Sequence, residues 1–97
     1  MIEIYASGCK IAIKGHAGFA PIGQDIVCAG VSTLYGTYLY SVNAEESTEG
    51  EWKMLKAEPV GKNRYVFNAI RTGFEMLSEH FPNHIRLVSA YPTQDKK

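Results

Sequence analysis

The spacing of the hydrophobic residues first changes at Asp25, and that change limits the folds this chain can adopt. Before this point, apolar residues alternate with others in two short runs, Ile2–Ala6 and Lys10–Lys14. A period of two predicts a strand for each run. The Ser7-Gly8 pair between them is a turn signal, so the two strands are expected to form an antiparallel hairpin.

After Asp25 the apolar residues recur at helical spacing and predict one helix from about Ile26 to Val42. Asp25 suits the N-cap of this helix, because its carboxylate can accept hydrogen bonds from the unpaired amides of the first turn. The predicted apolar face consists of Val27, Val31, Leu34, Tyr38 and Val42. The polar, acidic segment 43–50 that follows is expected to be a loop.

The second half of the chain predicts one further helix between two strands. Trp52, Met54 and Leu55 indicate a strand that ends near Pro59, and Asn63 is expected to cap the helix. Pro82 stops that helix, and a short last strand follows it. The apolar face of the helix is predicted from Val66, Ile70, Phe74, Leu77 and Phe81, and the last strand from Ile85, Leu87 and Val88.

The predicted element order is therefore β-β-α-β-α-β. Such an order favours an α+β fold, in which two helices cover one face of a mixed, mainly antiparallel sheet. A length of 97 residues fits a single domain over residues 1–97 and leaves no room for a second.

Charge and composition disfavour several classes of partner. The formal net charge is zero, so no global field attracts nucleic acid or an anionic membrane. No apolar run approaches the roughly 20 residues needed to span a bilayer, and the first residues lack the pattern of a secretory signal. The expectation is a cytoplasmic protein without direct contact to nucleic acid or membrane, in which Cys9 and Cys28 remain thiols.

The segment from Gly15 to Ala29 carries the pattern most typical of chemistry. It places His16 at the end of a predicted strand and Cys28 in the first turn of the following helix, with a glycine-rich loop between them. A helix N-terminus favours a thiolate, which is the nucleophilic form of cysteine. A nearby imidazole can take the thiol proton and later return it to a leaving amine.

Two questions stay open at these residues. If Asp25 caps the helix through the Cys28 amide, that amide is not free for an oxyanion, whereas Asp25 could instead orient His16 as the third member of a triad. On spacing alone, Cys28 also fits a small buried hydrophobic residue. His16 equally fits an ordinary turn residue beside glycines.

Other site chemistries fit the sequence poorly. A phosphatase loop of the Cys-x5-Arg kind would need arginine where Leu34 stands, and no Gly-Lys-Ser/Thr follows the glycines to make a P-loop. The cysteines and histidines lack the paired spacings of a zinc site, so no metal is expected. No Cys-x-x-Cys pair is present for thiol–disulfide exchange.

Gly15-His16-Ala17, together with Gly23-Gln24-Asp25-Ile26-Val27-Cys28-Ala29 and then Val31-Ser32, resembles the signature of the ribosomal-processing cysteine proteases called Prp. The spacing of twelve positions between histidine and cysteine is similar to that of the family, as are the chain length and the predicted element order. Outside residues 15–32 the similarity rests on pattern and not on identity.

This resemblance implies a cofactor-free, cytoplasmic, homodimeric protease. The family removes an N-terminal extension from the large-subunit ribosomal protein numbered twenty-seven, cutting after an aromatic pair. Its nucleophile corresponds to Cys28 and its general base to His16, with Asp25 and Ser32 as supporting positions. A mobile lid is implied between the dyad residues, from Ala17 to Gln24, and the substrate-binding or lid candidates are Gly15, Ala17, Gly18, Phe19, Pro21, Ile22 and Gly23.

Two other functions remain open from the sequence. Phages carry Prp-like proteases that act on capsid proteins, and a non-catalytic module could use the same loop to bind ribosomal protein or RNA. Two features also set this chain apart, namely a tyrosine-rich first helix and an acidic run after it, either of which could alter the substrate or dimer surface. They comprise Tyr35, Tyr38 and Tyr40, and Glu45, Glu46, Glu49 and Glu51.

Overall fold

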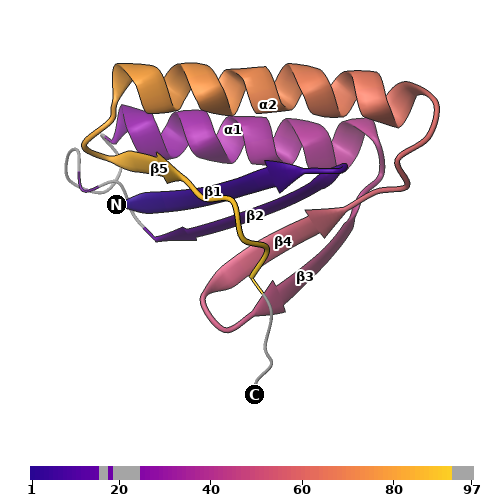
Figure 1. Ribbon diagram of the computed structural model, residues 1–97, viewed down its shortest axis with the longest axis horizontal. Coiled ribbons are helices and arrows are strands. Elements are labelled where there is room, and N and C mark those ends of the chain that lie inside the picture. The colour runs from indigo at the N-terminus through magenta and orange to yellow at the C-terminus, as the bar shows by residue number, and fades with distance from the viewer. Residues whose placement is uncertain (16–17, 19–24, 93–97) are drawn as a thin grey trace.

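The computed structural model describes residues 1–15, 18 and 25–92, and within them it has five strands and two helices (Figure 1). In chain order the elements are β1 (Ile2–Ser7), β2 (Lys10–Gly15), α1 (Ile26–Ser41), β3 (Glu45–Glu49), β4 (Trp52–Lys56), α2 (Lys62–His80) and β5 (Ile85–Leu87).

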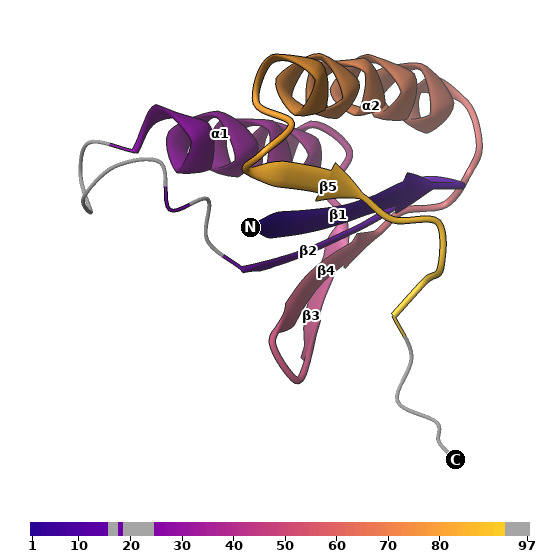
Figure 2. The same ribbon diagram turned by 60° about the vertical axis from the view of Figure 1, so that its left-hand side comes forward.

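The strands form one mixed sheet in the order β3-β4-β2-β1-β5. Only the β1–β5 pair is parallel, and the three other neighbouring pairs are antiparallel. Both helices lie on the same face of the sheet, as Figures 1 and 2 show from two directions. The predicted α+β class and the two-layer arrangement are confirmed.

The expectation of a loop over residues 43–50 is wrong, because Glu45–Glu49 form the edge strand β3. They pair with β4 in a continuous register from Glu45 opposite Lys56 to Glu49 opposite Trp52. The segment Glu-Glu-Ser-Thr-Glu holds no apolar residue, so period-two hydrophobicity could not reveal it. The element order is therefore β-β-α-β-β-α-β.

The start of α2 also differs from the prediction. Its N-cap is Gly61, whose φ of +55° suits glycine, and no side chain caps this helix. Asn63 already lies inside the helix and donates from Nδ2 to the carbonyl oxygen of Glu58 at 3.1 Å. β4 ends at Lys56, before the expected boundary near Pro59.

The core lies between the helices and the sheet. The residues buried by α1 are Val27, Val31, Tyr35 and Tyr38, and those buried by α2 are Phe67, Ile70 and Phe74. The other predicted face residues, Leu34, Val42, Val66, Leu77 and Phe81, are partly buried against this core. Glycines bring the two helices close together, since a Cβ on Gly73 would lie 2.8 Å from a methyl carbon of Leu34.

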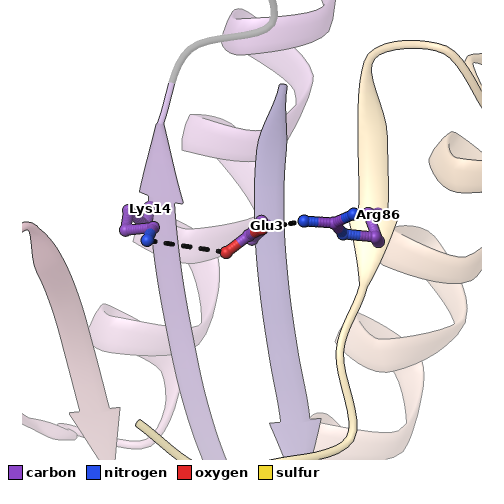
Figure 3. Close-up of polar contacts among 3 residues, drawn as sticks. All are labelled: Glu3, Lys14 and Arg86. Atoms are coloured by element: carbon purple, nitrogen blue, oxygen red, sulfur yellow. Dashed lines mark hydrogen bonds and ion pairs between the residues drawn. The ribbon is translucent and has the colours of Figure 1, made fainter.

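Charged side chains tie three strands together on the sheet face opposite the helices (Figure 3). Glu3 of β1 lies between Lys14 of β2 and Arg86 of β5. The Nζ of Lys14 is 3.7 Å from one carboxylate oxygen of Glu3, and Arg86 bonds to the other oxygen. The hydrogen bond from Arg86 is the main reason why the pKa of Glu3 lies below its usual value.

Candidate active site

The last residue of β2 is Gly15, and only glycine fits there. Its φ is +98°, and a Cβ would lie 2.3 Å from the carbonyl oxygen of Met1. Gly15 pairs with Ile2, so the end of β2 lies beside the start of β1. The strand therefore ends at a fixed point, immediately before His16 in the sequence.

Asp25 is the N-cap of α1, as predicted. Its backbone is extended, with φ −85° and ψ 97°, and its Oδ1 accepts hydrogen bonds from the amides of Val27 and Cys28, each at 3.0 Å. A cap of this kind satisfies amides that the helix itself leaves unpaired. The Cys28 amide is thus taken by Asp25, and an oxyanion would need a different donor.

Cys28 is the third residue of α1 and is partly buried against the hydrophobic core. Cys9 lies at the opposite end of the sheet, in the turn between β1 and β2, and is only 2% exposed. Its carbonyl oxygen accepts a 2.9 Å hydrogen bond from the hydroxyl of Tyr38, a residue near the other end of α1. Neither cysteine forms a disulfide, and the two differ in accessibility, since Cys9 is buried and Cys28 is partly exposed.

The other predicted site residues divide into two groups. Ser32 is exposed on α1, one turn after Cys28 and on the same side of the helix. Gly18 is exposed and has a φ of +65°. His16, Ala17, Phe19, Pro21, Ile22 and Gly23 lie outside the described residues, so the histidine base and the lid remain predictions.

Sequence reasoning overlooked the backbone amide of Ile26. Ile26 is the first residue of α1, and the amides of the next two residues are held by Asp25. Among the described residues, none accepts a hydrogen bond from the Ile26 amide. Its position directly after an aspartate N-cap is a signal that could have identified it.

The part of the chain that the structure describes offers neither a metal cluster nor a membrane-spanning helix. Within it, no group of three or more histidine, cysteine, aspartate or glutamate side chains is arranged to hold a metal ion. No helix within it has the length and apolar character to cross a membrane.

Comparison with known proteins identifies relatives over most of the chain. The family model described as cysteine protease Prp matches residues 2–86. The ribosomal processing cysteine protease Prp of Mycoplasma genitalium is 31% identical over 91 residues, covering 88% of this chain and 92% of the relative. The protein of the same name from Mycoplasma pneumoniae is 30% identical over 91 residues, covering 88% and 91%.

Solved structures share the fold. A crystal structure of the essential ribosomal processing protease Prp from S. aureus, with a covalently linked product peptide, superposes with a TM-score of 0.76 at 16% identity. That match covers 92% of this chain and 97% of the other. A Streptococcus mutans protein gives a TM-score of 0.69 at 21% identity, covering 89% and 92%.

The family match spans nearly the whole chain, and the curated relatives agree with it over almost their full length. The sheet with two helices on one face agrees with the solved Prp structure. This chain belongs to the Prp family of cysteine proteases.

Proposed function

We propose that this protein is an endopeptidase that removes the N-terminal extension of the large-subunit ribosomal protein numbered twenty-seven, with Cys28 as nucleophile and His16 as general base. The observation that carries the assignment is the position of Cys28 in the first turn of α1, held by the Asp25 cap. The relatives in both Mycoplasma species are named as ribosomal processing proteases, which supports this class of substrate. Such a substrate would place the protein in the cytoplasm.

In the first half of the reaction, His16 takes the proton of the Cys28 thiol, and the sulfur attacks the scissile carbonyl carbon. The carbonyl π electrons move to oxygen and give a tetrahedral oxyanion. When this intermediate collapses, the C–N bond breaks and the imidazolium returns its proton to the leaving amine. The N-terminal fragment remains attached to Cys28 as a thioester.

In the second half, water attacks the thioester while His16 accepts a proton from it. The C–S bond then breaks, the thiolate of Cys28 is regenerated, and the N-terminal fragment leaves as a carboxylic acid. No redox change and no cofactor enter this balance.

The oxyanion requires hydrogen-bond donors near Cys28. The amides of Val27 and Cys28 are occupied by Asp25, whereas the amide of Ile26 has no acceptor among the described residues. We assign the Ile26 amide as one donor to the oxyanion. A donor supplied by the backbone of a capped helix is fixed before the substrate arrives, which is the condition for effective stabilisation of a transition state.

The test is cleavage of a peptide that spans the extension and the first residues of the mature ribosomal protein from the same organism, followed by mass spectrometry. Wild-type protein should give one cut, Cys28→Ala should give none, and a thioester adduct should be trapped on Cys28 at low pH. Absence of cleavage by the wild type would contradict this substrate. If a capsid-protein peptide were cut instead, the chain would be a protease of the phage type.

A homodimer is the second part of the proposal, and the outer face of α1 supports it. α1 holds no charged residue in 16 positions. The hydroxyls of Thr33 and Thr37 donate back to carbonyls of their own helix at 2.8 and 2.7 Å, and Tyr40 is 84% exposed. An uncharged helix face of this kind suits packing against a second copy, since no like charges meet across a two-fold axis.

The dimer is tested by sedimentation of Thr37→Lys protein, which should be monomeric where the wild type is dimeric. Thr72→Lys is the matched control, because Thr72 is an exposed threonine on α2 whose hydroxyl also bonds to its own helix, at 2.9 Å. If both variants sediment like the wild type, α1 is not the interface.

A further inference from the structure

The strand β3 forms an edge of the sheet and has no strand beyond it among the described residues. A two-residue turn at Gly50 and Glu51 joins it to β4, so Glu49 and Trp52 are the pair whose backbone groups face each other. Backbone groups alternate along an antiparallel strand. Those of Glu46 and Thr48 therefore point away from β4 and are available to a further strand.

This edge is held firmly in place. The hydroxyl of the buried Tyr35 on α1 donates a 2.8 Å hydrogen bond to Oε2 of Glu46. The Nζ of Lys53 on β4 lies 5.5 Å from the centre of the Tyr35 ring. All five residues of β3 are paired with β4. An edge that is already ordered loses little entropy when a partner strand binds to it.

The charges on this edge define what can bind to it. Glu45, Glu46 and Glu49 lie on β3, and Glu51 lies in the turn that follows. A second copy of β3 paired antiparallel about Ser47 would set Glu45 opposite Glu49, and like charges directly opposite each other are destabilising. The edge therefore disfavours its own copy and favours an extended segment rich in lysine or arginine.

Glu49 provides an independent observation. Its Oε2 is buried and has no hydrogen-bond partner in the described part of the chain. A buried carboxylate oxygen without a hydrogen-bond donor costs free energy, and positive charge brought near Glu49 by a bound segment would reduce that cost through Coulomb attraction.

The register places this edge within reach of the candidate active site. Ile13 of β2 lies opposite Lys53 of β4, so the β3–β4 turn and Gly15 are at the same end of the sheet. β4 alone separates β3 from β2. Two strand spacings amount to about 10 Å, which an extended peptide crosses in about three residues.

We infer that the outer edge of β3 binds a basic, extended segment of the substrate, located C-terminal to the scissile bond, by adding it to the sheet as a sixth strand. This inference rests on the proposed function and specifies its substrate further. Backbone hydrogen bonds to Glu46 and Thr48 supply the strand pairing, and the carboxylates select lysine and arginine. Proteins that bind ribosomal RNA need such basic segments, because the phosphate backbone dominates their affinity.

The experiment uses one cleavable peptide with three different tails, each joined by a six-residue Gly-Ser linker after the cut site. The tails alternate threonine with lysine, serine or glutamate. For the wild type, the lysine tail should lower KM about tenfold relative to the serine tail and leave kcat unchanged, because the tail binds as a second, linked site. The glutamate tail should give no gain.

Two sets of variants separate charge from strand pairing. Glu45→Gln combined with Glu49→Gln should remove most of the lysine-tail gain, whereas Glu79→Gln on the exposed side of α2 should retain it. Thr48→Pro removes an outward amide, a change that edge strands tolerate. It should abolish the gain, and Thr48→Val, which keeps the amide, should not.

The tail-less peptide keeps the two proposals distinguishable. If it is cut normally and all three tails give the same KM in the wild type, the inference about β3 is wrong and the proposed function stands. If it is not cut, the proposed function fails. Fluorescence anisotropy of the labelled tails with the Cys28→Ala protein then tests β3 alone, and equal binding of the lysine and serine tails would overturn the inference.

Discussion

Oδ1 of Asp25 accepts a hydrogen bond from the amide of Cys28 at 3.0 Å, so the residue that starts α1 also fixes the backbone of the proposed nucleophile. The same oxygen accepts from Val27. The carboxylate thus has a structural task, which is to cap α1. We expect Asp25 to act as a helix cap that positions Cys28.

Replacement of Asp25 should distinguish this role from that of a triad member. Asn caps a helix about as well as Asp, whereas Ala loses about 1 kcal/mol. Asp25→Asn should retain the free energy of unfolding and most of kcat, and Asp25→Ala should lose about 1 kcal/mol in urea denaturation. A fall of roughly 10⁴-fold in kcat for Asp25→Asn would instead match a triad carboxylate.

Gly15 should tolerate no side chain. Its φ is +98°, and a Cβ would lie 2.3 Å from the Met1 carbonyl oxygen, so Gly15→Ala must move the β1–β2 pair at the end nearest the site. The matched control is Gly8→Ala, since Gly8 has φ +59° but no atom within 4 Å of a Cβ. Gly8→Ala should cost about 1–2 kcal/mol from its dihedral alone, and thermal unfolding should show a larger loss for Gly15→Ala. Equal losses would contradict the steric argument.

The lowered pKa of Glu3 predicts how the stability of the fold depends on pH. The hydrogen bond from Arg86 lowers the pKa of Glu3 in the folded protein below the unfolded value of about 4.5. The ionised Glu3 carboxylate therefore contributes fully to the free energy of unfolding above the unfolded pKa. This contribution disappears as the pH falls through the lower folded pKa. The free energy of unfolding should be smaller for Glu3→Gln than for the wild type at pH 7, and this difference should shrink toward pH 3. A difference that stays constant between pH 7 and pH 3 would exclude this linkage.

The sequence was sufficient for the parts of the fold that bury a regular apolar face. Ile2 and Ile4 alternate along β1, and Val27, Val31 and Tyr38 recur along α1, so burial and local pattern agree there. It was insufficient for β3, whose pairing comes from β4 and not from its own side chains. It also misplaced the cap of α2, because a backbone turn at Gly61 and not the Asn63 side chain starts that helix.

In the candidate site, too, the sequence predicted some of the residues and missed another. Asp25 and Cys28 were found because their roles depend on position along one helix, which sequence spacing reports directly. The availability of the Ile26 amide depends on which first-turn amides the Asp25 carboxylate occupies. Only atomic positions could determine that.

Accessibility should separate the two thiols. Cys9 is only 2% exposed, whereas Cys28 is partly exposed at the start of α1. Iodoacetamide should label Cys28 first in the native protein and abolish cleavage, as peptide mapping and activity would show together. Cys9→Ser should remain active. Labelling of Cys9 as fast as Cys28 in folded protein would contradict the structure.

The sharpest test of the site concerns the Ile26 amide. Ile26→Pro removes that single N–H at the first position of α1, where proline is favoured. The extended backbone of Asp25, with ψ 97°, is compatible with a following proline. Ile26 is 61% exposed, so little apolar burial is lost. The variant should fold with near wild-type stability and yet lose about 10²–10³-fold in kcat, the usual effect of deleting an oxyanion donor.

Ile26→Ala is the matched control, because it removes the side chain and retains the amide. It should keep kcat within a few-fold of the wild type and can change only KM. The Pro variant should also form its acyl-enzyme more slowly in single-turnover experiments, since the donor acts on the intermediate and not on substrate binding. If Ile26→Pro is folded and cleaves as fast as Ile26→Ala, the oxyanion is stabilised by other groups, and the first turn of α1 serves only to position Cys28.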